Sequence, residues 1–75
     1  MELFEINNLK QKLLSGELIE LSNENDMVQL FHRKSLDGSE QFFIELNCKI
    51  IKMTKRFRTF RDNVWELVNE RNLRF

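Results

Sequence analysis

The sequence predicts a single small α+β domain in which two helices pack on an antiparallel sheet. Apolar residues recur at helical spacing near the start of the chain, alternate with polar residues through its middle, and recur at helical spacing again after residue 59. Seventy-five residues suffice for one domain. We therefore expect a short N-terminal helix, a three- to four-stranded antiparallel meander, and a C-terminal amphipathic helix packed on one sheet face.

The first helix is expected over residues 4–14. Gly16 lies just beyond this segment and is a suitable C-terminal cap, because glycine readily adopts the left-handed conformation in which many helices end. The apolar residues that recur at helical spacing are Ile6, Leu9, Leu13 and Leu14.

Three strands are expected next, over residues 17–23, 27–34 and 41–47. The segment 35–40 between the second and third strands contains Asp-Gly, a common sequence in tight hairpin turns. Alternation in the third strand places Phe42, Ile44 and Leu46 on one face, and Gln41, Phe43, Glu45 and Asn47 on the other.

Residues 48–58 fit two different structures. As a strand, strict alternation would place Ile51 and Met53 on one face and Ile50 with Lys52 on the other. As part of a long helix beginning near residue 46, the segment would continue a heptad pattern of apolar residues, which no Gly or Pro interrupts. Periodicity alone leaves both structures open.

The final helix is expected from about residue 59. Thr59 could cap it, with Asp62 three residues later in the capping-box position. One face of this helix carries Phe60, Val64, Leu67 and Val68. Arg71 falls within the same stripe, so buried packing is expected to end before it.

Residues 35–55 resemble part of an uncharacterised family of small bacterial and prophage proteins that has no assigned function. The shared pattern is a Ser-Leu-Asp-Gly turn, then Glu-x-Phe, the triplet Ile-Glu-Leu at 44–46, and a further strand at 51–55. "LIEL" at 18–21 fits the family's earlier strand, so the resemblance covers about residues 18–61. It implies a strand over 49–56 but no activity. The chain departs from the family at Lys49, where a glycine is usual, in "RFRTF", and in lacking a counterpart of the family's histidine-containing second half.

The chain shows no catalytic or metal-binding pattern. Cys48 is the only cysteine and His32 the only histidine, so an intrachain disulfide is excluded and a zinc cluster is disfavoured. These two residues could meet as nucleophile and base only if adjacent strands brought them together. With two glycines, the chain also lacks a glycine-rich phosphate loop. We predict a protein that is not an enzyme and needs no cofactor or metal.

Charge is unevenly distributed although the net charge is zero. Residues 1–46 contain nine acidic and four basic residues, a balance of −5, whereas residues 47–75 contain three acidic and eight basic residues, a balance of +5. The segment "KRFRTFR" at 55–61 concentrates this positive charge. The residues predicted to bind a partner or nucleic acid are Lys49, Lys52, Lys55, Arg56, Arg58 and Arg61.

Two kinds of ligand are possible for this basic segment. Its cations could neutralise phosphates while Phe57 and Phe60 stack on unpaired bases, which predicts a small nucleic-acid-binding regulator. The two phenylalanines also fit the apolar stripe of the final helix, where they would be core. The neutral overall charge favours an acidic protein surface as the ligand, and nucleic acid remains the second choice.

Self-association is a further possibility, because a chain this short buries a small core. The residues suggested for such an interface are Trp65, Leu73 and Phe75.

The most favoured function is a non-catalytic protein-binding module. Asn, Lys, Ile and Phe are frequent and proline is absent, a composition typical of AT-rich bacterial and phage genomes. A small phage-type inhibitor or regulator of a larger host protein, such as an anti-CRISPR or other anti-defence protein, is one concrete form. A self-associating structural component is another alternative.

The sequence predicts a location in the cytoplasm. No apolar run approaches the length of a membrane span, and the first residues lack the basic and apolar regions of a secretory signal.

Overall fold

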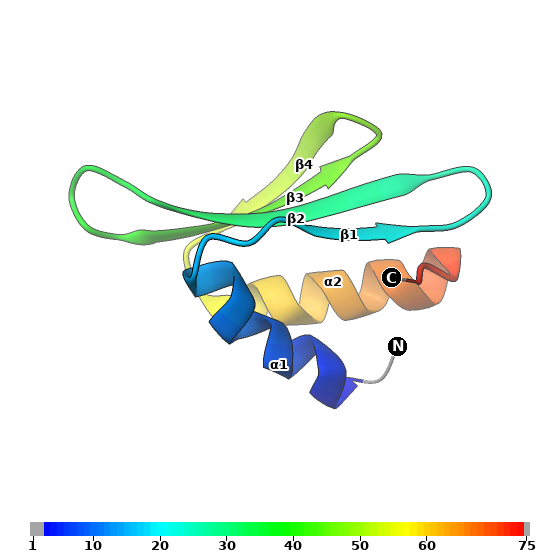
Figure 1. The fold of residues 1–75 in the computed structure, drawn as a ribbon, viewed down its shortest axis with the longest axis horizontal. Coiled ribbons are helices and arrows are strands. Elements are labelled where there is room, and N and C mark those ends of the chain that lie inside the picture. Colours follow the sequence, from blue (N-terminus) through cyan, green and yellow to red (C-terminus); the bar gives the residue numbers. More distant parts are fainter. Residues whose placement is uncertain (1–2, 75) are drawn as a thin grey trace.

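The computed structural model describes residues 3–74, and the observed fold is the predicted α+β class. The elements, in chain order, are α1 (Leu3–Leu14), β1 (Ile19–Ser22), β2 (Met27–Lys34), β3 (Glu40–Leu46), β4 (Lys49–Thr54) and α2 (Phe57–Arg71). The strands form one antiparallel sheet in the order β1-β2-β3-β4, so each strand pairs with its neighbours in the sequence. Both helices lie on the same side of the sheet, leaving its other face open (Figure 1).

The hydrophobic core lies between the sheet and the two helices. Alternate residues of the first three strands point into it, and α1 and α2 supply the facing residues. The buried apolar residues are Ile6, Leu9, Leu13, Ile19, Leu21, Val28, Leu30, Phe42, Ile44, Phe60, Val64, Val68 and Leu73. None of the buried residues among those described is polar or charged, so the centre of this layer is apolar.

The structure resolves residues 48–58 in favour of a strand followed by a helix. β4 covers Lys49–Thr54 and pairs with β3. The predicted start of the second helix at residue 59 is wrong, because α2 begins at Phe57 and its N-cap is Arg56. Thr59 therefore lies inside the helix, since the chain must turn earlier to bring Phe57 onto the core.

Strict alternation in β4 is also wrong. The register shifts between Ile44 and Glu45, which pair with Lys52 and Ile50 respectively. Directly paired residues share a sheet face, so Ile50 lies on the same face as Met53, which pairs with Phe43. The extra residue, Ile51, marks a β-bulge, a feature that sequence alternation does not reveal.

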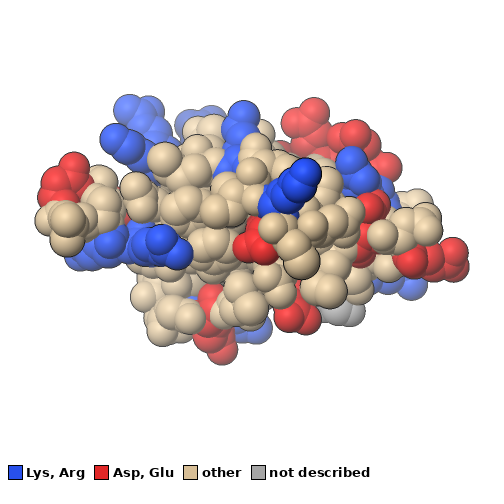
Figure 2. Space-filling view, turned by 90° about the horizontal axis from the view of Figure 1, so that it is seen from above, with Lys and Arg blue, Asp and Glu red and all other residues tan. Residues whose placement is uncertain are grey.

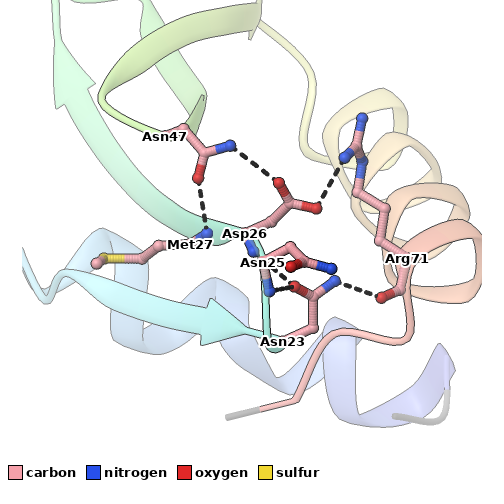
Figure 3. Close-up of polar contacts among 6 residues, drawn as sticks. All are labelled: Asn23, Asn25, Asp26, Met27, Asn47 and Arg71. Atoms are coloured by element: carbon pink, nitrogen blue, oxygen red, sulfur yellow. Dashed lines mark hydrogen bonds and ion pairs between the residues drawn. The ribbon is translucent and has the colours of Figure 1, made fainter.

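A polar network joins the turn between β1 and β2 to the rest of the molecule (Figure 3). Asp26 accepts hydrogen bonds from Asn47 Nδ2 and from Arg71 Nη1, both at 2.9 Å. Asn23 Nδ2 donates to the carbonyl oxygen of Arg71 at 2.6 Å. The Asn47 and Arg71 bonds hold the pKa of Asp26 below its ordinary value, because they favour the ionised carboxylate.

The chain after α2 returns to the end of the edge strand β1. Ser22 and Arg74 exchange two backbone hydrogen bonds, of 2.7 and 2.9 Å. This return buries Leu73, which is 1% exposed. Within α2 the last buried residue is Val68, so packing of the helix ends before Arg71 as predicted; Leu73 is buried beyond the helix because the left-handed Asn72 turns the chain back toward β1.

None of the helices within residues 3–74 is both long enough and apolar enough to span a bilayer.

Candidate interaction surface

The sheet face that the helices leave open carries an apolar band across three strands. Phe31, Phe43 and Met53 are paired neighbours on β2, β3 and β4, so their side chains lie side by side on this face. Phe31 and Phe43 are half-buried, and Met53 is 42% exposed. We call these three residues the apolar band.

Charged residues lie on both sides of the apolar band. Arg33 lies two residues beyond Phe31 on β2, and Lys55, which follows β4 at the edge of this face, lines one hollow with Gln41 and another with Phe57 on the helix side. We call Arg33 and Lys55 the basic band. On the other side, Glu45 lies two residues beyond Phe43 on β3, and pairs with Gln29.

Glu20 completes the acidic side of this face. It pairs with Gln29 in the sheet and accepts a hydrogen bond from Gln29 Nε2 at 3.3 Å, which confirms that the two side chains share a face. We call Glu20 and Glu45 the acidic band. Figure 2, which views the molecule from the sheet side, shows a tan central area with Lys and Arg groups around it in both halves, and acidic groups at both ends with the larger cluster on the right.

The two phenylalanine rings of the apolar band are stacked on each other. Their centroids are 4.9 Å apart and their planes differ by 10°. The guanidinium of Arg33 lies 5.5 Å from the Phe43 centroid and 6.0 Å from that of Phe31, within cation–π range. The faces that the rings turn toward each other are therefore unavailable to a nucleic-acid base.

The predicted basic residues do not form one continuous surface. Lys49 and Lys55 lie at opposite ends of β4, about 20 Å apart at the rise of a strand. Lys52 lines a small groove between β4 and α2. Arg61 is already engaged, because it donates to Asn7 at 3.1 Å and contacts Asp62.

Lys55, Arg56 and Arg58 are brought together where β4 joins α2. All three are exposed, and none forms an ion pair with another described residue. Phe57 and Phe60 from the same segment pack in the core instead, where both contact the ring of Phe42. Of the two alternatives that the sequence left open for these rings, the structure favours packing in the core over stacking on bases.

The suggested interface on the C-terminal helix is only partly available. Trp65 is 42% exposed on α2. Leu73 is buried in the chain's own core, so its predicted role in an interface is wrong. Phe75 lies outside the described residues.

The structure separates the two residues considered for nucleophilic catalysis. Cys48 lies in the turn between β3 and β4. His32 lies on β2 and pairs with Phe42, which is near the opposite end of β3. Phe42 and Cys48 are six residues apart, about 20 Å along a strand. The His32 ring contacts Glu40 instead. Within residues 3–74, no group of three or more His, Cys, Asp or Glu side chains could hold a metal ion.

Sequence reasoning missed the apolar band, although one signal for it was present. Phe43 falls on the otherwise polar face of its strand, between Gln41 and Glu45. A large aromatic residue in such a position indicates a contact on the sheet face that points away from the hydrophobic core. The pairing of Phe43 with both Phe31 and Met53 could be learned only from the register.

Comparison of the chain with family models, with curated proteins and with solved structures gives no significant match.

Proposed function

We propose that the chain is a non-catalytic protein-binding module whose docking surface is the open sheet face. One observation carries this proposal. The apolar band of Phe31, Phe43 and Met53 crosses a face that no helix covers, and Ile50, 57% exposed, extends it on β4. Aromatic residues, methionine and arginine are the residue types enriched in protein interfaces.

The geometry of the band favours a protein partner over a nucleic acid. The two rings are stacked on each other, and the guanidinium of Arg33 lies within 6.0 Å of both centroids. A base would need to separate the two rings to stack between them, whereas apolar side chains of a protein can pack on the band without stacking. The flanking acidic band would also repel a phosphate backbone.

An inhibitor or regulator of a larger host protein is one form of this function. The small size of the chain and its surface divided into apolar, basic and acidic bands support stoichiometric capture of a partner. An anti-defence protein of a phage, including one that acts on a CRISPR-type effector, belongs to this class. This form predicts action at one copy per target in the bacterial cytoplasm.

Affinity capture tests the docking surface. The tagged chain is incubated with nuclease-treated bacterial extract, in parallel with Phe43→Lys and with Trp65→Ala as a control on the helix side. We expect a stoichiometric partner that wild type and Trp65→Ala retain and that Phe43→Lys loses. Equal retention by a folded Phe43→Lys variant would show that the open face is not the docking surface. An effect on the target at catalytic, substoichiometric amounts would contradict the proposal as well.

Nucleic-acid binding is the second candidate, and one observation favours it. Lys55, Arg56 and Arg58 gather without ion-pair partners among the described residues, at the positive end of α2. Fluorescence anisotropy with a single-stranded oligonucleotide tests it. Binding that weakens steeply with salt and with Arg56→Ala or Arg58→Ala would support this candidate, and absence of binding at low salt would remove it.

A further inference from the structure

We propose that the protein docked on the open sheet face is a second copy of this chain, related by a two-fold axis that runs along the apolar band. The inference rests on the proposed function, because it names the occupant of the same surface. The result would be two sheets packed face to face, with both pairs of helices on the outside.

The apolar band is complementary to itself under this symmetry. An axis along the band, across the strands, places the band of one copy on the band of the other. Phe31, Phe43 and Met53 then contact the same three residues of the second copy. Two sheets in face-to-face contact lie about 10 Å apart, a spacing that side chains of this size fill.

The charges on both sides of the band select this axis. Rotation about it reverses the strand direction of the second copy, so the basic band of each copy faces the acidic band of the other. Arg33 lies about 13 Å along β2 from Gln29, the row that holds the acidic band. Each Arg33 is thereby placed between Glu20 and Glu45 of the second copy.

The other way of stacking the two faces is electrostatically unfavourable. An axis parallel to the strands would also superpose the apolar bands, but it would place the basic band of one copy in the same row as the basic band of the other, and acidic band with acidic band. Juxtaposed like charges at an interface disfavour binding. The order of basic, apolar and acidic rows therefore specifies one mutual orientation.

The edges of the sheet are poorly suited to self-association by strand addition. The β1 edge is only four residues long, and Arg74 occupies its end through two backbone hydrogen bonds with Ser22. The β4 edge carries Lys49 and Lys52 and is interrupted by the bulge at Ile51. Lysines and bulges on an edge strand obstruct pairing with another chain. The open sheet face is therefore the better surface for self-association.

The size and net charge of the chain also favour a second copy. A chain of 75 residues with one covered sheet face has a small core, and a sandwich would add a second apolar layer. Its net charge of zero produces little long-range repulsion between copies.

Sedimentation velocity across a range of protein concentrations tests the inference. The variants are Arg33→Glu, Glu45→Arg and the double reversal Arg33→Glu/Glu45→Arg, with Arg58→Glu as a matched charge control on α2. We expect wild type and Arg58→Glu to dimerise, and each single reversal in the open face to weaken dimerisation by about tenfold or more. The double reversal should restore it, because residue 33 of each copy again carries the charge opposite to that of residue 45 of the other copy.

A mixture of the two single variants gives the sharpest result. Arg33→Glu chains carry acidic residues in both flanking rows, whereas Glu45→Arg chains gain a cation in the acidic row. We expect the mixture to form a heterodimer more readily than either variant self-associates. Arg33 and Glu45 are too far apart to pair within one chain. A recovery of dimerisation in the mixture would therefore have to come from charge pairs between chains.

The failure of this inference is distinguishable from that of the proposed function. A wild-type chain that stays monomeric at the highest concentrations reached would overturn the second copy, as would a dimer unaffected by the single reversals. If such a chain still captures another protein through the Phe43-dependent surface, the binding function stands without self-association. A monomeric chain with no Phe43-dependent partner would contradict both.

Discussion

Phe42 and Phe43 are adjacent residues of the same strand with opposite environments. Phe42 is 2% exposed and packs in the core, where its ring centroid lies 5.5 Å from that of Phe57 and 5.4 Å from that of Phe60. Phe43 is half-buried on the open face, where its ring stacks on Phe31. The comparison shows that the chain places similar aromatic residues on both faces of the sheet, although its own helices cover only one face.

The largest expected effect is a difference in unfolding free energy between alanine variants of these two phenylalanines. Phe42→Ala should lower the free energy of unfolding by about 3–5 kcal/mol, because it leaves a cavity in a closed core. Phe43→Ala should cost about 1 kcal/mol, since its neighbours and water can occupy the vacated space. Urea denaturation followed by circular dichroism, at protein concentrations low enough to keep the chain monomeric, measures both. Equal losses would show that the open face already belongs to the core of one chain.

The second expected effect concerns the polar network at the end of the sheet, which fixes the turn that precedes β2. Asp26→Asn removes the charge that Asn47 and Arg71 stabilise, so the variant should unfold at lower urea concentration than wild type at neutral pH. The folded-state pKa of Asp26 is lowered from its ordinary value of 3.8, so its contribution is present above that pH and is lost as pH falls through the folded-state pKa.

The difference between Asp26→Asn and wild type should therefore narrow as the pH falls below about 4. Unfolding midpoints measured from pH 7 to about pH 2 test this dependence. Glu24→Gln, an exposed carboxyl in the same turn, is the matched control and should leave the midpoint nearly unchanged. If the difference in unfolding midpoint between Asp26→Asn and wild type stays constant with pH, the lost stability comes from packing rather than from charge.

A third effect concerns the register, which decides which phenylalanine faces the helices. A slip of one residue between strands would exchange the faces of Phe42 and Phe43. Asn47 and Cys48 form the turn that fixes this register, with φ values of 49° and 71°. Cys48→Gly should stabilise the fold by about 1 kcal/mol, because glycine adopts positive φ without the steric cost that other residues incur.

Thermal unfolding of Cys48→Gly beside wild type measures this gain. Leu36→Gly, in the fully exposed turn between β2 and β3, is the control and should bring no stabilisation. A loss of stability in Cys48→Gly would indicate that the thiol itself makes a favourable contact.

The smallest expected effect lies on the open face alone. Arg33→Met keeps an aliphatic side chain beside Phe31 and Phe43 but removes the cation, so the monomer should lose about 0.5 kcal/mol. Urea denaturation at low protein concentration measures this loss. High salt should leave most of it intact, since a cation–π contact of this kind is short-ranged. No measurable loss would mean that Arg33 matters only to a partner.

The fold was largely predictable from the sequence because its elements carry local signals. Gly16 ends the first helix and the alternation of residues 41–47 places Phe42 and Ile44 in the core, as expected. The sequence could not distinguish a strand from a helix over residues 48–58, because the apolar residues there fit both periodicities. The start of α2 was misplaced because a capping signal at Thr59 competed with the tertiary packing of Phe57, and packing prevailed.

The candidate site was much less predictable. The basic segment attracted attention because its residues are contiguous, yet the structure places Phe57 and Phe60 inside and engages Arg61. The apolar band combines three residues from three strands, so it depends on pairings between segments. Leu73 was misassigned to the surface because a return of the chain after a left-handed residue leaves no local pattern.

The order of the strands has a consequence for how quickly the chain folds. Every strand pair joins neighbours in the sequence, so the sheet can form through successive short hairpins. Distant parts of the chain meet in the packing of α2 against α1 and in the bridge from Ser22 to Arg74. Chains dominated by local contacts fold rapidly, so we expect a nucleus in the β2–β3 hairpin, with α2 docking late. Kinetic φ-values near zero for Val64→Ala and high for Ile44→Val would support this order, and the reverse pattern would refute it.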